Sequence, residues 1–147
     1  MKSLFLDLDV VLDVLLNRAP GAEAASALWA AVETGKDRGL VTAHAVTTIH
    51  ALMKRSRGRA FSDRAVADLL AVFNVARVSE AVLNAALSLR LDSFDDAVSV
   101  AAAGAARCDF LVARDPARFR GAPVEVVSPA EALARLSASR KDALRSR

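Results

Sequence analysis

The chain has 147 residues, of which 54% are hydrophobic, with only six glycines and four prolines. This composition predicts one ordered globular domain and excludes a disordered or low-complexity protein. The formal charge of +3 lies entirely in the last segment, SRKDALRSR, so the preceding residues are neutral as a whole. We therefore expect a folded domain at residues 1–138 and a basic, disordered tail at residues 139–147.

The sequence favours a cytoplasmic protein without membrane contact. A membrane span takes about 18 apolar residues, and Asp7, Asp9 and Asp13 interrupt the only candidate stretch. The amino terminus, MKSLFLDLD, lacks the long apolar segment of a signal peptide. The single cysteine, Cys108, cannot form an internal disulfide, which fits a reducing compartment.

Strands and helices are expected to alternate along the chain. The apolar run SLFLD at residues 3–7 predicts a buried strand, and helical spacing begins at Val10 and ends at NRAPG. A second helix is expected to end near Gly35. The remaining elements are a strand at 39–43, helices at 44–56 and 62–73 (capped by Ser62), a strand at 74–79, helices at 80–91 and 95–108, strands at 109–113 and 123–127, and a helix at 128–136 capped by Ser128.

This alternation predicts a three-layer α/β/α domain with a five-stranded, largely parallel sheet. In such sheets, ligands bind beyond the carboxyl ends of the strands. Asp7 ends the first strand, Asp115 follows the fourth, and Asp96 lies at the start of a helix. We therefore expect these three acids to converge at one edge. For Asp95 and Asp92, capping of a helix start is the simpler explanation.

Asp7 and Asp9 form a D-x-D motif that opens two unrelated classes of enzyme. In a haloacid-dehalogenase-like phosphatase, Asp7 would be the nucleophile and Asp9 the general acid. That family places small residues after the second aspartate, whereas Val10 and Val11 follow it here. It also needs a lysine before its last acidic motif, and none lies just upstream of LVARD. The phosphatase interpretation is therefore the weaker of the two.

The sequence resembles PIN-domain nucleases, most closely the VapC-like toxins of bacterial toxin–antitoxin pairs, which are magnesium- or manganese-dependent ribonucleases. Four stretches carry the resemblance, which covers about residues 3–136: FLDLDVVLDVLLNRAP, LDSFDDAVSVAAA, LVARDPARFRG and PVEVVSPAEALARL. The resemblance implies that Asp7, Asp96 and Asp115 hold the metal and that Asp9 or Asp95 binds waters around it. Carboxylate oxygens suit Mg²⁺ or Mn²⁺, which stabilise charge and activate water in phosphodiester hydrolysis.

One position departs from the family. PIN domains usually carry a glutamate in the third helix, and the matching stretch TTIHALMKR places His50 there. Imidazole removes one negative charge and suits manganese better than magnesium. His50 is therefore either a metal ligand or water-orienting residue, or the mark of a degenerate site. In the second case the protein would bind RNA or another protein without cleaving it.

Two basic clusters are candidate RNA contacts. Lys54, Arg55 and Arg57 belong to the run KRSRGR, and Arg114 and Arg118 flank the acidic position after the fourth strand. No aromatic residues interleave with these clusters, so base stacking is not predicted. The resemblance further implies a small antitoxin protein as partner and a homodimer.

Overall fold

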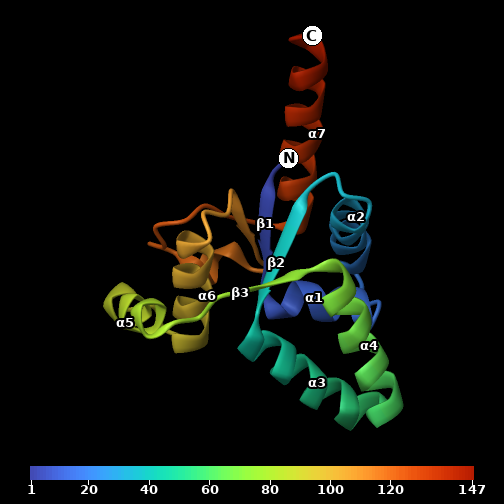
Figure 1. The fold of residues 1–147 in the computed structure, drawn as a ribbon, viewed down its shortest axis with the longest axis vertical. Coiled ribbons are helices and arrows are strands. Elements are labelled where there is room, and N and C mark those ends of the chain that lie inside the picture. The colour runs from blue at the N-terminus through green and yellow to red at the C-terminus, as the bar shows by residue number, and fades with distance from the viewer.

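A parallel sheet forms the centre of the protein, whose computed structural model describes residues 1–147 (Figure 1). Its strands are β1 (Ser3–Leu6), β2 (Arg38–Thr42), β3 (Asn74–Ala76), β4 (Phe110–Val112) and β5 (Val126–Val127). They lie in the order β3-β2-β1-β4-β5, and every neighbouring pair is parallel. The prediction of a five-stranded parallel sheet is confirmed.

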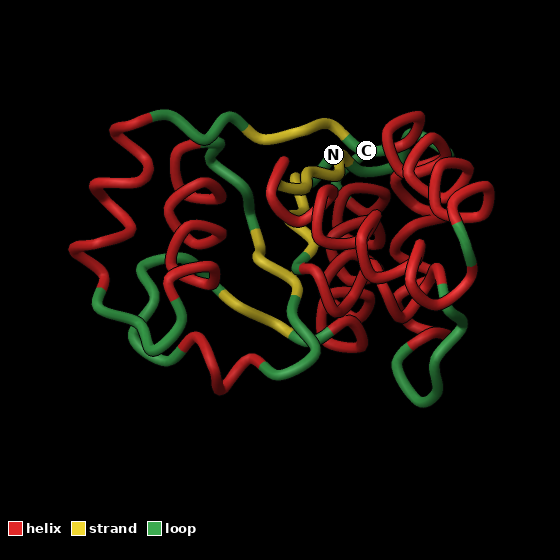
Figure 2. The backbone as a smooth tube through the Cα atoms, turned by 90° about the horizontal axis from the view of Figure 1, so that it is seen from below, coloured by secondary structure: helices red, strands yellow, loops and turns green.

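Helices cover both faces of this sheet, which confirms the three-layer α/β/α architecture (Figure 2). One face carries α1 (Leu8–Leu15), α2 (Ala22–Glu33), α3 (Ala43–Arg57), α4 (Arg59–Val72) and α7 (Pro129–Arg145). The other face carries α5 (Glu80–Leu89) and α6 (Phe94–Ala105), and a short 3-10 helix, η1 (Pro116–Phe119), follows β4. None of the helices combines the length and the apolar composition that crossing a membrane requires.

The central strand β1 contributes side chains to both cores. Leu4 and Leu6 are fully buried in the core shared with α1, α2 and α3, whereas Phe5 is buried in the core on the α6 face. Successive side chains of a strand point to opposite faces, so a strand covered on both sides is apolar throughout. Each such side chain contributes about 1.5–3 kcal/mol when buried, so β1 holds the two helical layers together.

The junction of α3 and α4 differs from the prediction. Gly58, with a φ of 85°, ends α3, and α4 begins at the very next residue. Such a φ favours glycine, because other residues would be strained there. The Ser62 hydroxyl donates a 2.7 Å hydrogen bond to the carbonyl of His50 and so ties α4 to α3. The prediction that Ser62 caps the helix is therefore wrong.

The last helix continues into the segment that was predicted to be a disordered tail. Ser128 caps α7 as expected, but the helix runs on to Arg145. Arg140 pairs at 2.8 Å with Asp37, whose side chain is only 2% exposed. A buried carboxylate from the loop before β2 thus provides a partner for the tail, and the prediction of disorder from residue 139 is corrected.

Candidate active site

The candidate site lies at the carboxyl end of β1, in the middle of the sheet. The chain passes from β1 to β2 and β3 on one side and returns to place β4 and β5 on the other. Ligands bind at such a reversal in parallel α/β sheets, because the adjoining loops diverge there. Asp7 follows β1 directly at the N-cap position of α1, and Asp96 lies in the first turn of α6, which Ser93 caps.

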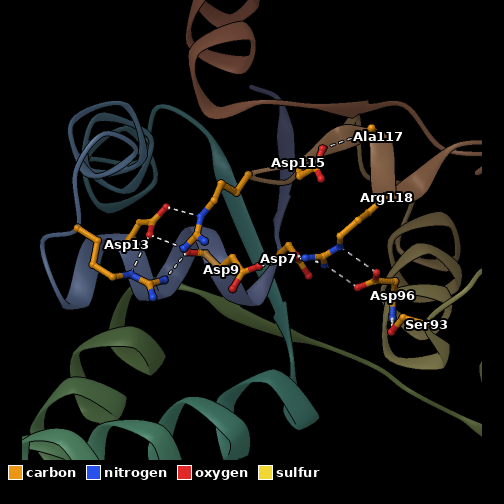
Figure 3. A network of polar contacts seen from close by, with 10 residues as sticks. Asp7, Asp9, Asp13, Ser93, Asp96, Asp115, Ala117 and Arg118 are labelled. Carbon is orange, nitrogen blue, oxygen red and sulfur yellow. Dashed lines mark hydrogen bonds and ion pairs between the residues drawn. The ribbon is translucent and has the colours of Figure 1, made fainter.

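Three aspartates share one arginine side chain at this edge (Figure 3). Arg118 of η1 places its Nη2 atom 3.3 Å from Asp7 and 2.9 Å from Asp96. Its Nη1 atom lies 3.1 Å from Asp9, and its Nε atom lies 3.2 Å from the second oxygen of Asp96. The fold thus gathers Asp7, Asp9 and Asp96, which come from two helices on opposite faces of the sheet.

The charges in this cluster are not balanced. Asp7 is 6% exposed, and burial is the main reason that its pKa rises to about 6. The hydrogen bond from the Leu8 backbone and the charge of Arg118 lower this pKa, whereas the charges of Asp96 and Asp9 raise it. Three carboxylates facing one guanidinium leave a net negative charge. A cation of higher charge would neutralise the cluster better.

A cleft of about 740 Å³ opens over the cluster. Asp7, Asp9, Asp96 and Arg118 line it, so the cluster is accessible to a ligand. The same cleft is lined by two further acids, one histidine, one threonine and two more arginines: Asp92, Asp95, His44, Thr48, Arg90 and Arg120. An acidic cluster bordered by arginines suits a metal ion together with a polyanion.

Asp115, the third predicted ligand, lies apart from the cluster. Its side chain accepts a 3.3 Å hydrogen bond from the backbone N–H of Ala117 and thereby caps η1 (Figure 3). It does not line the cleft. The expected convergence of Asp115 with Asp7 and Asp96 is therefore corrected, and Asp9 takes the third place.

His50 does not point from the third helix towards the acids, as was predicted. Its Nε2 atom lies 2.7 Å from Asp63 of α4, and it does not line the cleft. Successive residues of an α-helix are rotated by about 100°, so residues 48 and 50 face nearly opposite directions. Thr48 and His44, one turn apart, form the cleft-facing side of α3. That four-residue spacing was the signal in the sequence that could have identified them.

The predicted RNA contacts divide between two places. Arg114 and Arg118 lie beside the cluster, although Arg114 pairs with Asp13 at 2.7 Å and Arg118 is engaged by the three aspartates. Lys54, Arg55 and Arg57 belong to the last turn of α3. At 1.5 Å per residue, they lie about 9 Å or more along the helix from the cleft-facing residues. The structure does not bring this second group to the cleft.

The donor set fits a hard divalent cation, provided that Arg118 withdraws. No three His, Cys, Asp or Glu side chains are arranged to hold a metal ion in this conformation. Carboxylate oxygens are nevertheless the ligands that Mg²⁺ and Mn²⁺ prefer, and those of Asp7, Asp9 and Asp96 already face one cationic group. The Arg118 side chain is 41% exposed, so solvent can receive it.

Comparison with protein families identifies one match, which spans most of the chain. The family model of the PIN domain matches residues 3–117, a range that contains Asp7, Asp9 and Asp96. Among curated proteins, none matches this sequence.

Several solved structures share the fold at low sequence identity. VapBC-1 from nontypeable Haemophilus influenzae gives a TM-score of 0.70 at 13% identity, covering 87% of this chain and 98% of the other. VapC20 from Mycobacterium tuberculosis, described as a sarcin-ricin loop cleaving toxin, gives 0.67 at 22% identity, with 84% and 98% covered. FitAcB from Neisseria gonorrhoeae gives 0.65 at 17% identity, with 86% and 98% covered. Similarity at these identities establishes the fold.

Proposed function

Because the chain belongs to the PIN-domain family, we propose that it is a metal-dependent endoribonuclease that acts as the toxin of a toxin–antitoxin pair. Membership of this family favours a metal-ligand role for Asp7 over the nucleophile role that the D-x-D motif also allowed. The substrate is RNA, and the reaction is hydrolysis of a phosphodiester bond in the cleft above β1.

One observation carries the proposal, namely that three aspartates share a single cationic group at the carboxyl edge of the sheet. Their contacts with Arg118 measure 2.9 Å to 3.3 Å. Two like charges about 4 Å apart repel by about 4 kcal/mol at an effective dielectric constant of 20. The cluster is therefore unfavourable without a cation. Burial, and after it the charges of Asp96 and Asp9, raise the pKa of Asp7 to about 6.

The residues of the chain divide the work of such a reaction. Asp7 and Asp96 would hold Mg²⁺ or Mn²⁺, and Asp9 would contribute a further carboxylate to the same ion. When bound, the ion supplies charge stabilisation and lowers the pKa of a water molecule. Arg118, once released from the acids, is placed to bind a phosphate oxygen, because it stays tethered to η1 at the cleft wall.

The experiment is RNA cleavage by the purified protein in the presence of Mg²⁺ or Mn²⁺. We expect cleavage of a single-stranded or structured RNA that EDTA abolishes, and a loss of at least about 100-fold in rate in Asp96→Asn, of the size that one lost charge-stabilising group causes. Asp115→Asn is the matched control, because Asp115 does not line the cleft, and it should retain activity. Cleavage that persists in Asp96→Asn and EDTA would contradict the proposal.

A second candidate function is a PIN fold that binds RNA or protein without cleaving it. The occupation of the cation position by Arg118 favours this alternative, since an arginine can neutralise the cluster permanently. Under this alternative, neither Mg²⁺ nor Mn²⁺ would raise the melting temperature of the wild-type protein, and RNA would bind but remain intact.

The third helix offers a sharper test of the metal site. Thr48 lines the cleft and His50 does not, so a glutamate at residue 48 adds an anionic ligand to the site and one at residue 50 does not. We expect Thr48→Glu to strengthen Mg²⁺ binding by about tenfold, which corresponds to about 1.4 kcal/mol, and His50→Glu to leave it unchanged. Calorimetric titration measures both affinities. A gain in His50→Glu alone would show that α3 presents its other side to the metal.

Two of the solved structures that share this fold support a protein partner. The solved structures with this fold include a toxin–antitoxin complex from Klebsiella pneumoniae and VapBC2 from Rickettsia felis bound to a DNA fragment from their promoter. We propose that this chain likewise binds a small antitoxin protein, and that it forms a homodimer. Co-expression with the product of the neighbouring reading frame, followed by size-exclusion chromatography, measures both associations.

A further inference from the structure

A second cavity, of about 380 Å³, lies beside α1 and the start of α7. Asp13 forms part of its wall, one helical turn beyond Asp9 on α1. Arg18, from the loop after α1, and Arg114, from the loop after β4, also line it. We call this cavity the Asp13 pocket. None of its residues takes part in the acidic cluster described above.

A buried carboxylate holds the two arginines of this pocket in place. The Asp13 side chain is 5% exposed, and its Oδ1 atom lies 3.0 Å from Arg18 Nε and 2.7 Å from Arg114 Nη2. Arg114 also donates through Nε to the second oxygen at 3.2 Å. The hydrogen bond with Asp13 raises the pKa of Arg114, which stays charged. One carboxylate between two guanidinium groups leaves a local charge of +1.

Both arginines keep donors for a ligand. Their side chains are 38% and 47% exposed, and the Nη1 atom of each makes no hydrogen bond within the protein. Because Asp13 fixes the two guanidinium planes, little side-chain entropy remains to be lost on binding. An arginine pair held in this way is preorganised for an anion with several oxygens, such as a phosphate.

The start of α7 also favours an anion in the Asp13 pocket. Ala130 lines the pocket, and its backbone N–H has no partner. The Ser128 hydroxyl accepts from the backbone N–H of Glu131, and the Ser128 carbonyl accepts from that of Ala132. The amino end of this 17-residue helix also carries a partial positive charge.

We propose that the Asp13 pocket binds a backbone phosphate of the RNA, next to the segment that enters the acidic cleft. The proposal rests on the nuclease function above and extends it with a substrate-binding site. The two sites are adjacent, because the Nη2 atom of Arg18 lies 3.5 Å from the backbone carbonyl oxygen of Asp9. An RNA strand can therefore pass from the metal-binding acids to a basic pocket along one side of α1.

The test places a negative charge in the pocket without touching the arginines. Ala24 of α2 lines the pocket, so Ala24→Glu offers Arg18 and Arg114 a permanent internal anion, and Ala24→Gln fills the same space without charge. The first probe is inorganic phosphate, titrated at constant ionic strength while the melting temperature is measured. We expect saturable stabilisation of the wild type and of Ala24→Gln, and none in Ala24→Glu.

The second probe is a single-stranded RNA, bound in an Asp96→Asn background to prevent cleavage. We expect Ala24→Glu to weaken binding by about tenfold and to reduce the slope of log affinity against log salt by about 0.7, which is the share of one phosphate contact. Ala24→Gln should keep the slope. Ala130→Glu repeats the test from the exposed first turn of α7, where an acid does not disturb folding.

The outcomes separate this proposal from the nuclease function. Equal phosphate stabilisation in wild type and Ala24→Glu would overturn the pocket, since phosphate would then bind elsewhere. Loss of phosphate binding with unchanged RNA affinity would also overturn it, and would assign the pocket to another anion, such as a partner's carboxylate. If both probes respond as expected but wild type cleaves no RNA with any metal, the result supports the phosphate-binding pocket and contradicts the nuclease function.

Discussion

Replacing Arg118 by glutamine is expected to strengthen Mn²⁺ binding by at least about tenfold, or about 1.4 kcal/mol. Arg118 contacts Asp7, Asp9 and Asp96 at once, so a metal ion has to displace its guanidinium before these oxygens become ligands. Glutamine keeps much of the side-chain volume but carries no charge, and it removes this competition. Calorimetric titration of Mn²⁺ into both proteins measures the difference.

The same substitution should destabilise the metal-free protein. It leaves three carboxylates without their shared counter-charge, and breaking a fully buried pair costs about 3–5 kcal/mol. Because the Arg118 side chain is 41% exposed, solvent screens the charges, and we expect a loss of about 1–2 kcal/mol. Arg120→Gln, on the wall of the same cleft but outside the cluster, should change neither quantity. Equal Mn²⁺ affinity in Arg118→Gln and wild type would contradict this account.

Replacing Asp7 by asparagine is expected to stabilise the metal-free protein at neutral pH by about 3 kcal/mol, since its pKa rises from 3.8 to about 6 and each unit is worth about 1.36 kcal/mol. The unfolded chain ionises Asp7 with little cost, whereas the folded protein ionises it against burial and against Asp96 and Asp9. Asparagine removes that cost and still offers Arg118 an acceptor oxygen.

The pH dependence follows from the sign of this shift. Between about pH 4 and pH 6 the folded protein holds a proton on Asp7 that the unfolded chain has lost, so the wild type loses stability as pH rises through this window. Below it, both states are protonated and the cost disappears. The difference in unfolding free energy between wild type and Asp7→Asn should therefore grow from near zero at pH 4 to its full size above pH 6. Urea denaturation at several pH values measures it.

Added metal provides the control for this comparison. Mn²⁺ should stabilise the wild type and have little effect on Asp7→Asn. The difference in unfolding free energy between the two proteins should therefore shrink or change sign when Mn²⁺ is added. A difference that is constant from pH 4 to pH 8 would show that the Asp7 carboxylate is not desolvated in the folded protein.

The sequence partly predicts which acids come together, because a parallel sheet brings the residues that follow its strands to one edge. Asp7 ends an apolar strand, and Asp96 opens a helix, and the carboxyl ends of parallel strands lie at one edge. Side-chain direction was not readable in the same way. Asp115 also follows a strand, yet a hydrogen bond to the backbone of its own turn holds it away from the cluster.

Which residue of α3 faces the acids depends on the rotation of the helix about its axis, and the sequence motif did not determine that rotation. His50 lies two residues beyond Thr48, and that offset turns it by about 200° to Asp63 on α4. A motif match compares residue types along the sequence, so it can place His50 at a position that is two residues away from the one facing the acids. In the helix, each position points its side chain in one direction, so the same offset moves the side chain to another face.

The sequence by itself determined the alternation of strands and helices, the parallel sheet and the meeting of Asp7 with Asp96, since hydrophobic periodicity and chain topology are local or modular properties. Only the tertiary structure decided the ionic partners. Arg118 reaches Asp7, Arg114 reaches Asp13 and Arg140 reaches Asp37 across more than 100 residues of chain. Such pairs form where packing places two side chains within about 3 Å and excludes water around the carboxylate, and no spacing along the sequence encodes that distance.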